Sequence, residues 1–159
     1  MKDFLLQTIK EAGDLAMSFY GKELHVRTKS HPTDLVTDAD IAVSDFITKK
    51  IQEKYPDHCI ISEEAACINE GSDDVWYIDP IDGTTNFTHN IPLWCVMVGY
   101  RKDGDTKMSA VYNPVSNQLF FAERGKGAFL NDVKIKGRQV DDLGSAAFHI
   151  ILNKKGSHG

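Results

Sequence analysis

Carboxylates and hydroxyls crowd one short stretch of the sequence, which reads Asp-Pro-Ile-Asp-Gly-Thr-Thr from Asp79 to Thr85. Pro80 fixes φ and Gly83 allows a ligand to approach the backbone closely, so the stretch is predicted to form a tight loop. Two carboxylates and the carbonyl between them suit a hard, oxygen-seeking cation, and the amides that follow suit an anion. The stretch therefore predicts a site for a metal ion and a phosphate.

The residues before this loop predict a strand that positions it. Trp76-Tyr77-Ile78 is aromatic and β-branched, which favours a buried strand. Asp-Pro followed by Asp-Gly then predicts a turn at the end of the strand, after which a helix could begin at Thr84. An ordinary strand-turn-helix corner, in which Asp79 and Asp82 cap backbone amides, is the alternative interpretation.

A second pair of carboxylates, Glu63 and Glu64, follows the apolar run Cys59-Ile60-Ile61. A short apolar run after a turn is consistent with a strand, and this strand would deliver Ser62 and the two glutamates at its end. Such a pair is usually a solvated strand end. The alternative is that the glutamates converge with the Asp79 loop.

Helical spacing and turn signals predict the elements around these strands. Apolar residues recur at helical spacing from Lys2 to Tyr20, and Gly21 supplies a stop. Thr37 or Asp38 can cap a second helix that ends at Tyr55-Pro56. Two polar segments are predicted to be loops, namely Lys22–Val36 and Ala65–Asp74.

The second half of the sequence reads as short strands joined by turns. Strands are predicted over Trp94–Arg101, Lys107–Tyr112 and Gln118–Glu123, with short strands and turns continuing to about Ile135. Two helices followed by such a meander predict a layered α+β domain. The helices are expected to pack on one face of a mainly antiparallel sheet.

Composition narrows the class of protein. The 159 residues, 42% of them apolar, suffice for one domain with its own core, and the net charge of -5 argues against a surface that holds nucleic acid by general basic attraction. No apolar run is long enough to span a bilayer. Three cysteines without Cys-x-x-Cys spacing predict neither a disulfide framework nor a zinc site, and they favour a reducing, cytoplasmic setting.

The string Asp-Pro-Ile-Asp-Gly-Thr-Thr-Asn-Phe at residues 79–87 resembles the signature of the inositol monophosphatase family of magnesium-dependent phosphomonoesterases. The resemblance implies that Asp79 bridges two metal ions, that Ile81 is a ligand through its carbonyl, and that Asp82 binds the second metal. It also implies that Gly83 and Thr84 contact the phosphate. Thr85 is then a neighbour of the metal ligands that does not itself bind the metal.

Two upstream segments are similar to the same family. Lys29–Asp40 looks like its lysine and acidic helix start, which implies that Lys29 lies on a loop near the active site and Asp40 close to the metals. Residues 60–64 are similar to a strand ending in Gly-Glu-Glu, with Ser62 in place of the glycine. Glu63 is then a metal ligand that contacts the attacking water together with Thr84, and Glu64 lies behind it.

The resemblance implies hydrolysis of inositol monophosphate to inositol and phosphate by a water activated by Mg²⁺, with lithium sensitivity and homodimerisation. Thr85-Asn86 favours this branch over relatives that act on nucleotides. Two alternatives stay open: a non-catalytic regulatory module that binds RNA-related machinery, and a phosphatase for another sugar or nucleotide phosphate.

The resemblance covers the first domain of the sugar phosphatase fold, which we assign to residues 1–144. Residues 145–159 are expected to be a truncated start of the second α/β domain or a non-native tail. Family members carry a Trp-Asp metal ligand in that second domain, and neither Trp76 nor Trp94 is followed by aspartate. We therefore expect weak magnesium binding and little or no turnover from this chain alone.

Overall fold

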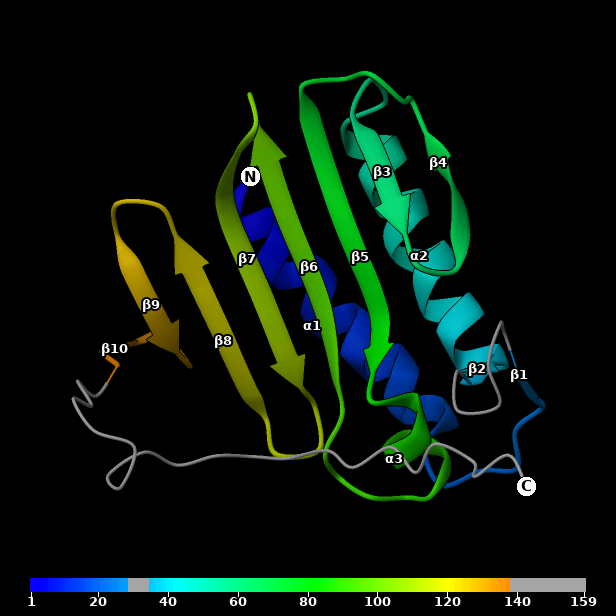
Figure 1. Ribbon diagram of the computed structural model, residues 1–159. Helices are drawn as coiled ribbons and strands as arrows, with labels where there is room; N and C mark the ends of the chain where they lie inside the picture. The colour runs from blue at the N-terminus through cyan, green and yellow to red at the C-terminus, as the bar shows by residue number, and fades with distance from the viewer. Residues whose placement is uncertain (29–34, 138–159) are drawn as a thin grey trace, which may run out of the picture.

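Helices and strands alternate early in the chain and give way to strands alone later (Figure 1). The computed structural model describes residues 1–28 and 35–137, so Lys29 and the segment 145–159 lie outside the described residues. The elements are α1 Lys2–Phe19, β1 Val26–Thr28, β2 Leu35–Thr37, α2 Asp38–Lys54, β3 Cys59–Ser62, β4 Ala65–Ile68, β5 Asp74–Asp82, α3 Thr84–Thr88, β6 Cys95–Lys102, β7 Asp105–Asn113, β8 Gln118–Glu123, β9 Gly127–Leu130 and β10 Val133–Ile135.

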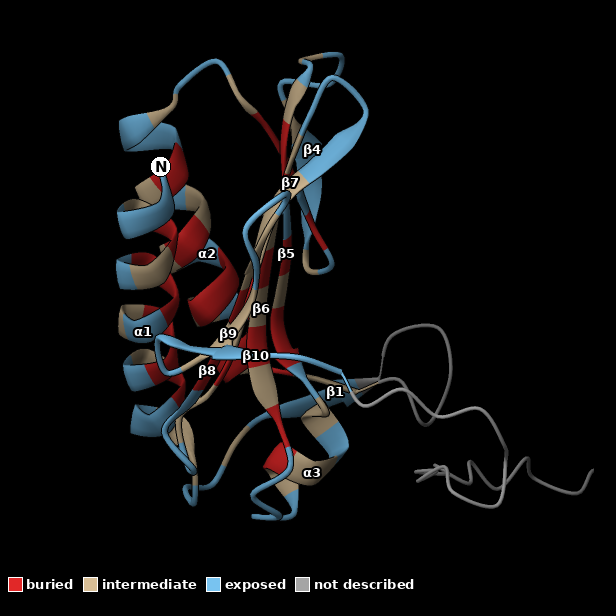
Figure 2. Cartoon of the chain, turned by 90° about the vertical axis from the view of Figure 1, so that its left-hand side faces the viewer, coloured by how far each residue is buried: buried red, intermediate tan, exposed pale blue. Residues whose placement is uncertain are grey.

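The main sheet has eight strands in the order β10-β9-β8-β7-β6-β5-β3-β4. Only the β3–β5 pair is parallel within it, and the other neighbours are antiparallel. Helices α1 and α2 both pack against one face, and no described helix covers the other (Figure 2). This confirms the predicted layered α+β fold. None of the described helices combines the length and the apolar character that crossing a bilayer requires.

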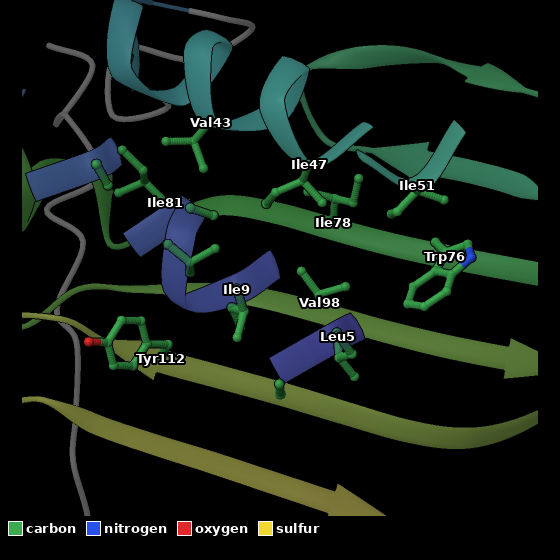
Figure 3. Packing of buried hydrophobic residues seen from close by; sticks show 14 of the residues in the cluster. Leu5, Ile9, Val43, Ile47, Ile51, Trp76, Ile78, Ile81, Val98 and Tyr112 are labelled. Atoms are coloured by element: carbon green, nitrogen blue, oxygen red, sulfur yellow. The ribbon is translucent and has the colours of Figure 1, made fainter. Parts of the chain in front are cut away.

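The core lies between the two helices and the sheet (Figure 3). Leu5 and Ile9 of α1 and Ile47 of α2 are at most 1% exposed and point toward β5 and β6, where Trp76 and Val98 are also buried. Each such side chain contributes about 1.5–3 kcal/mol through burial. The apolar spacing that predicts the helices is therefore the spacing that fills the core.

Two segments predicted to be loops contain short strands. Residues 26–28 and 35–37 pair as β1 and β2, and residues 65–68 form β4 at the edge of the main sheet. The loop predictions are wrong there, because strands of only three or four residues carry too little apolar alternation to be recognised. Pairing with a neighbouring strand decides their conformation.

The turn after β5 also comes later than predicted. The strand continues through Pro80 to Asp82, and its register with β6 is interrupted between Asp79 and Asp82. Pro80 has no N–H to donate, so it fits where the hydrogen-bond ladder is broken. The chain turns at Gly83, and the predicted helix follows as α3.

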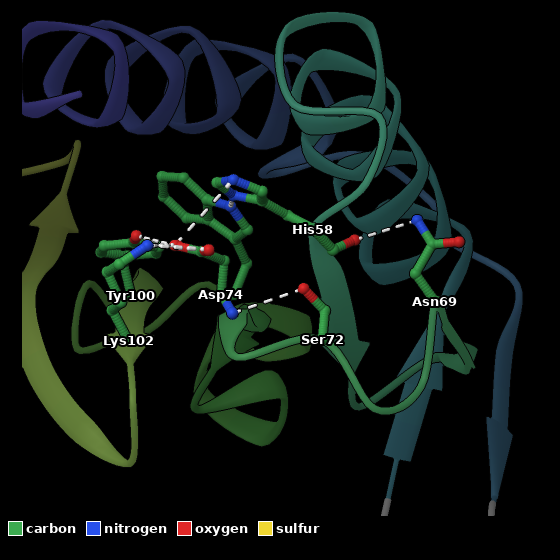
Figure 4. Close-up of polar contacts among 7 residues, drawn as sticks. His58, Asn69, Ser72, Asp74, Tyr100 and Lys102 are labelled. Carbon is green, nitrogen blue, oxygen red and sulfur yellow. Dashed lines mark hydrogen bonds and ion pairs between the residues drawn. The ribbon is translucent and has the colours of Figure 1, made fainter.

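A polar network closes the end of the sheet that lies far from Gly83 (Figure 4). Asp74 accepts hydrogen bonds from the Tyr100 hydroxyl and from the Lys102 ammonium, the latter at 3.0 Å. The indole of Trp76 donates to Nδ1 of His58 at 3.0 Å. The hydrogen bond from Tyr100, followed by that from Lys102, lowers the pKa of Asp74, so its ionised form is stabilised in the fold.

Gly13 of α1 packs directly against Tyr112 of β7. A Cβ at Gly13 would lie 2.5 Å from Cδ1 of that ring. Helix propensity alone would make Gly13→Ala stabilising by about 1 kcal/mol. Because the ring is buried and cannot move freely, we expect the opposite sign, a loss of about 1–3 kcal/mol in urea unfolding. In a Tyr112→Leu background the loss caused by Gly13→Ala should be smaller, and additive losses would show that the ring contact is not the cause.

Asp74→Asn is expected to lower the free energy of unfolding at pH 7 by about 1–2 kcal/mol, because the charge-assisted hydrogen bond from Lys102 is lost. The pKa of Asp74 is lowered in the folded chain, so its contribution is present above the ordinary value of 3.8 and disappears as the pH falls through the folded value. The free energies of unfolding of wild type and variant, measured with urea, should therefore converge at acid pH. Asp73→Asn, at an exposed neighbour, is the control and should change little at either pH.

Candidate active site

Gly83 sets the shape of the loop that carries the aspartates. Its φ is +89°, a left-handed conformation that glycine adopts without strain. A Cβ there would lie 2.9 Å from the carbonyl oxygen of Leu93. That carbonyl also accepts a hydrogen bond from the Asn86 amide at 2.7 Å, so α3 and the segment before β6 enclose the glycine. The position admits no larger side chain without displacing backbone.

Asp40 joins the start of α2 to this loop. One of its oxygens, Oδ2, accepts from the amide and the hydroxyl of Thr37, at 2.8 and 2.5 Å, in the capping box that begins the helix. Its other oxygen, Oδ1, accepts from the hydroxyl of Thr84 at 3.2 Å. The same hydroxyl lies 3.0 Å from the carbonyl oxygen of Ile81. One buried carboxylate therefore ties together a helix cap and the predicted metal loop.

The burial of Asp40 determines what it can do. Only 1% of the residue is exposed, and this burial raises the pKa of its carboxyl, while the hydrogen bonds from Thr37 and Thr84 act in the opposite direction. With both oxygens engaged inside the protein, the side chain is placed to orient Thr84. The structure puts it beneath the loop, in contact with the hydroxyl of that threonine.

Glu63 emerges beside the strand that leads into the loop. Its amide donates to the carbonyl of Ile78 at 3.2 Å, where β3 runs parallel to β5. Ser62 occupies the position where a glycine was expected, and its side chain turns toward α2, with its hydroxyl 2.6 Å from that of Ser44. The serine also accepts from the amide of Glu64 at 3.4 Å.

Two hollows receive the predicted site residues. Glu63 and Asp79 line one of about 450 Å³ on the face of the sheet without helices, together with Tyr77 and Met97. Asp82 lines another, of about 360 Å³, which is also lined by Gly83, Asn86 and Cys95. The structure thus brings Glu63 next to Asp79, while Asp82 faces the second hollow.

Cys95 contacts Asp82 and was not singled out from the sequence. Its thiol donates to Oδ2 of Asp82 at 3.7 Å, and β6 pairs the two residues. Burial raises the pKa of Cys95 to about 12, with further contributions from Asp82 and then Asp79. The thiol therefore contacts the Asp82 carboxylate directly. No local sequence signal places Cys95 here, because the strand pairing alone brings it opposite Asp82.

The remaining predicted residues lie at the margins of this site. Thr85 is exposed, and its carbonyl accepts a hydrogen bond from the hydroxyl of Thr88 at 2.9 Å. Glu64 is half-buried next to Glu63. Their predicted roles behind the ligands stay predictions.

The donors at the site are all oxygens, which suits Mg²⁺ better than zinc. They are the carboxylates of Glu63, Asp79 and Asp82 and the carbonyl of Ile81. Within residues 1–28 and 35–137, no group of three His, Cys, Asp or Glu side chains is arranged to hold a metal by itself. Magnesium is commonly held by one or two carboxylates, with phosphate oxygens and water completing its octahedron. The donor chemistry fits that ion.

The chain is similar to known proteins both in sequence and in structure. The chain is 37% identical to human inositol monophosphatase 1 over 145 residues, which are 89% of this chain and 52% of that protein. It is 37% identical to the Nus factor SuhB of Vibrio cholerae over 148 residues, 92% of this chain and 55% of that protein. The structure of an inositol monophosphatase from Thermotoga maritima superposes with a TM-score of 0.81 at 35% identity, covering 86% of this chain and 53% of that one.

This chain spans about half the length of these relatives. The profile of the inositol monophosphatase family matches residues 1–158, which is nearly the whole sequence. With the helices, the sheet and the Asp79–Phe87 loop in place, the chain belongs to the inositol monophosphatase family.

Proposed function

We propose that this chain provides the metal-binding and phosphate-binding part of a magnesium-dependent phosphomonoesterase. The observation that carries this proposal is the hydrogen-bonded connection from Asp40 through Thr84 to Ile81, which places a hydroxyl between a buried carboxylate and the predicted metal loop. Membership in a phosphatase family supports it. The proposed unit is residues 1–144.

The predicted site residues have separate proposed roles in binding the metal and the phosphate. Glu63, Asp79 and Asp82, with the carbonyl of Ile81, would hold Mg²⁺, which supplies charge stabilisation of the phosphoryl oxygens when bound. Gly83 and Thr84 would contact the phosphate through their amides. In our proposal Lys29 also lies near the phosphate, although it falls outside the described residues.

Thr84 would position the attacking water. Its single hydroxyl proton is directed to Asp40 or to the carbonyl of Ile81, at 3.2 and 3.0 Å. An oxygen lone pair is then left to accept a hydrogen bond from a water molecule. Glu63 would accept a hydrogen bond from the other O–H of that water. Such positioning, more than strong base catalysis, is what phosphoryl transfer requires.

The proposed substrate is a sugar-alcohol monophosphate such as inositol monophosphate. The signature at residues 79–87 and the inositol monophosphatases among the relatives support this choice. Magnesium as the physiological ion, inhibition by lithium, homodimerisation and a cytoplasmic setting belong to the same proposal and rest on family membership. Another sugar phosphate or nucleotide phosphate remains an alternative substrate.

A non-catalytic binding role is the second candidate. One relative is named a Nus factor, and the sheet face without helices exposes apolar side chains, with Ile61 and Tyr77 at 38% and 39% exposure. A partner that binds this face would cover the hollow lined by Glu63 and Asp79. The two roles differ in their need for a metal ion: the phosphatase role requires bound Mg²⁺, whereas the binding role does not.

The first test measures Mg²⁺ binding by calorimetry. Asp82→Asn should weaken binding by about tenfold or more, a loss that is found even for residues behind metal ligands. Asp82 is exposed, so the fold should not change. Asp45→Asn, which alters an exposed aspartate on α2, is the matched control and should bind like wild type.

The same variants should be joined to the half of an inositol monophosphatase that this chain does not cover, and phosphate release from inositol 1-phosphate measured with Mg²⁺. We expect the wild-type fusion to release phosphate and Asp82→Asn to abolish this release. Magnesium binding unaffected by Asp82→Asn, together with a silent fusion, would contradict the phosphatase proposal and favour the binding role.

The connection between Asp40 and Thr84 is tested by a double-mutant cycle. Asp40→Asn and Thr84→Val should each destabilise the chain by about 1–3 kcal/mol in urea unfolding, because each breaks a buried hydrogen bond. Both substitutions remove the same contact. The loss in free energy of unfolding of the double variant should therefore be smaller than the sum of the two single losses, by about 0.5 kcal/mol or more. Strict additivity would show that the two side chains act separately. Asp38→Asn, which is half-buried in the same helix turn, is the control.

A further inference from the structure

Two thiols face each other across the edge hairpin formed by β3 and β4. The Sγ atoms of Cys59 and Cys67 are 3.5 Å apart. The cysteines lie on adjacent antiparallel strands whose register shifts between Ile60 and Ser62. A disulfide bond is about 2 Å long, so the sulfurs need to approach by only about 1.5 Å. Neither cysteine belongs to the candidate active site.

The hairpin is able to make this small movement. Strand β4 is the last strand of the sheet and pairs with β3 alone, and three of its four residues, Ala65 to Cys67, are exposed. Only its fourth residue, Ile68, packs against the hydrophobic core, so a shift of β4 toward β3 affects few core contacts. At the far end of β4, the Asn69 side-chain amide donates to the carbonyl of Pro56 at 2.7 Å and to that of His58 at 3.1 Å. Figure 4 shows the bond to His58. These bonds hold Cys67 close to Cys59.

The two thiols differ in access to solvent. Cys67 is exposed, whereas only 3% of Cys59 is exposed. Burial raises the pKa of Cys59 to about 11, and its hydrogen bond with Cys67 acts in the same direction. An oxidant in solution therefore meets Cys67 first. Cys59 is placed behind it, at contact distance, where a resolving thiol has to be.

We propose that Cys59 and Cys67 form an oxidisable dithiol that closes to an intramolecular disulfide in the presence of a small disulfide such as oxidised glutathione. The Cys67 thiolate attacks one glutathione sulfur, which releases the first glutathione thiolate and leaves a mixed disulfide. Cys59 then loses its proton and attacks Sγ of Cys67, which releases the second glutathione. Two protein thiols are oxidised, and one glutathione disulfide is reduced to two thiols.

The bond would enclose the turn between the strands. Glu63 and Glu64 lie between the two cysteines in sequence, so the disulfide closes a small covalent ring around them. The proposal itself concerns only the thiols and stands whether or not the chain is a phosphatase.

The test incubates the metal-free chain with oxidised glutathione and counts free thiols. Wild type should fall from three thiols to one, with a mass lower by about 2 Da, the two hydrogens lost in forming the bond. Peptide mapping without reducing agent should find the peptide that contains Cys59 linked to the peptide that contains Cys67. The matched control Cys95→Ser should form the same bond and retain no thiol. Cys67→Ser, at an exposed position, should form no intramolecular bond.

The closing step should also depend on pH. Because burial raises the pKa of Cys59 above its ordinary value of 9.0, its thiolate fraction, and with it the closing rate, should rise with pH between roughly pH 7 and 9. Wild type that accumulates only a glutathione adduct on Cys67, without the loss of mass, would overturn the proposal. A bond between Cys59 and Cys95 in the Cys67→Ser variant would overturn it as well, since it would show that the hairpin does not select the pair.

Discussion

The buried carboxylate of Asp40 is the constraint on which the arrangement of the site depends. Its two oxygens bond Thr37 on one side and Thr84 on the other. These contacts join the start of α2 to a loop 44 residues later in the sequence. Burying a charged group is costly unless its hydrogen bonds are made. Moving the loop away from α2 would leave Asp40 without one of its donors, so the position of Thr84 follows from the need to satisfy this carboxylate.

The break in the β5–β6 register is the second constraint. Pro80 cannot donate a ladder hydrogen bond, and the pairing resumes only at Asp82 opposite Cys95. The interruption separates Asp79, which faces the hollow shared with Glu63, from Asp82, which faces the hollow next to Gly83. A regular strand would repeat every two residues and would point these two side chains to opposite faces. The irregularity sets Asp82 opposite Cys95, whose thiol donates to its carboxylate.

The sheet also explains why the site and the redox pair are close without being the same feature. Strand β3 ends in Glu63, which lies in the hollow with Asp79, and the next strand carries Cys67 back to Cys59. The hairpin therefore has one end at the candidate active site and the other at the dithiol. Because β4 lies at the sheet edge, this hairpin is held by fewer neighbours than the strands of the core.

Much of the fold could be predicted because its signals are local. The helical spacing from Lys2 onward, the Thr37 cap and the strand predicted over Trp94–Arg101 each depend on a few neighbouring residues. The short strands β1, β2 and β4 could not be predicted, since pairing with another strand stabilises them. The position of the turn at Gly83 was missed for the same reason, because pairing with β6 carries β5 beyond Pro80.

The sequence by itself determined which oxygen donors are candidates for a hard cation, namely those of residues 79–87 and of Glu63. The tertiary structure alone decided which of them meet. The burial of Asp40 beneath Thr84, the shared hollow of Glu63 and Asp79, and the approach of Cys95 to Asp82 and of Cys67 to Cys59 all join residues from different elements. Such contacts depend on strand register and helix packing, which act between residues distant in sequence and leave no local pattern.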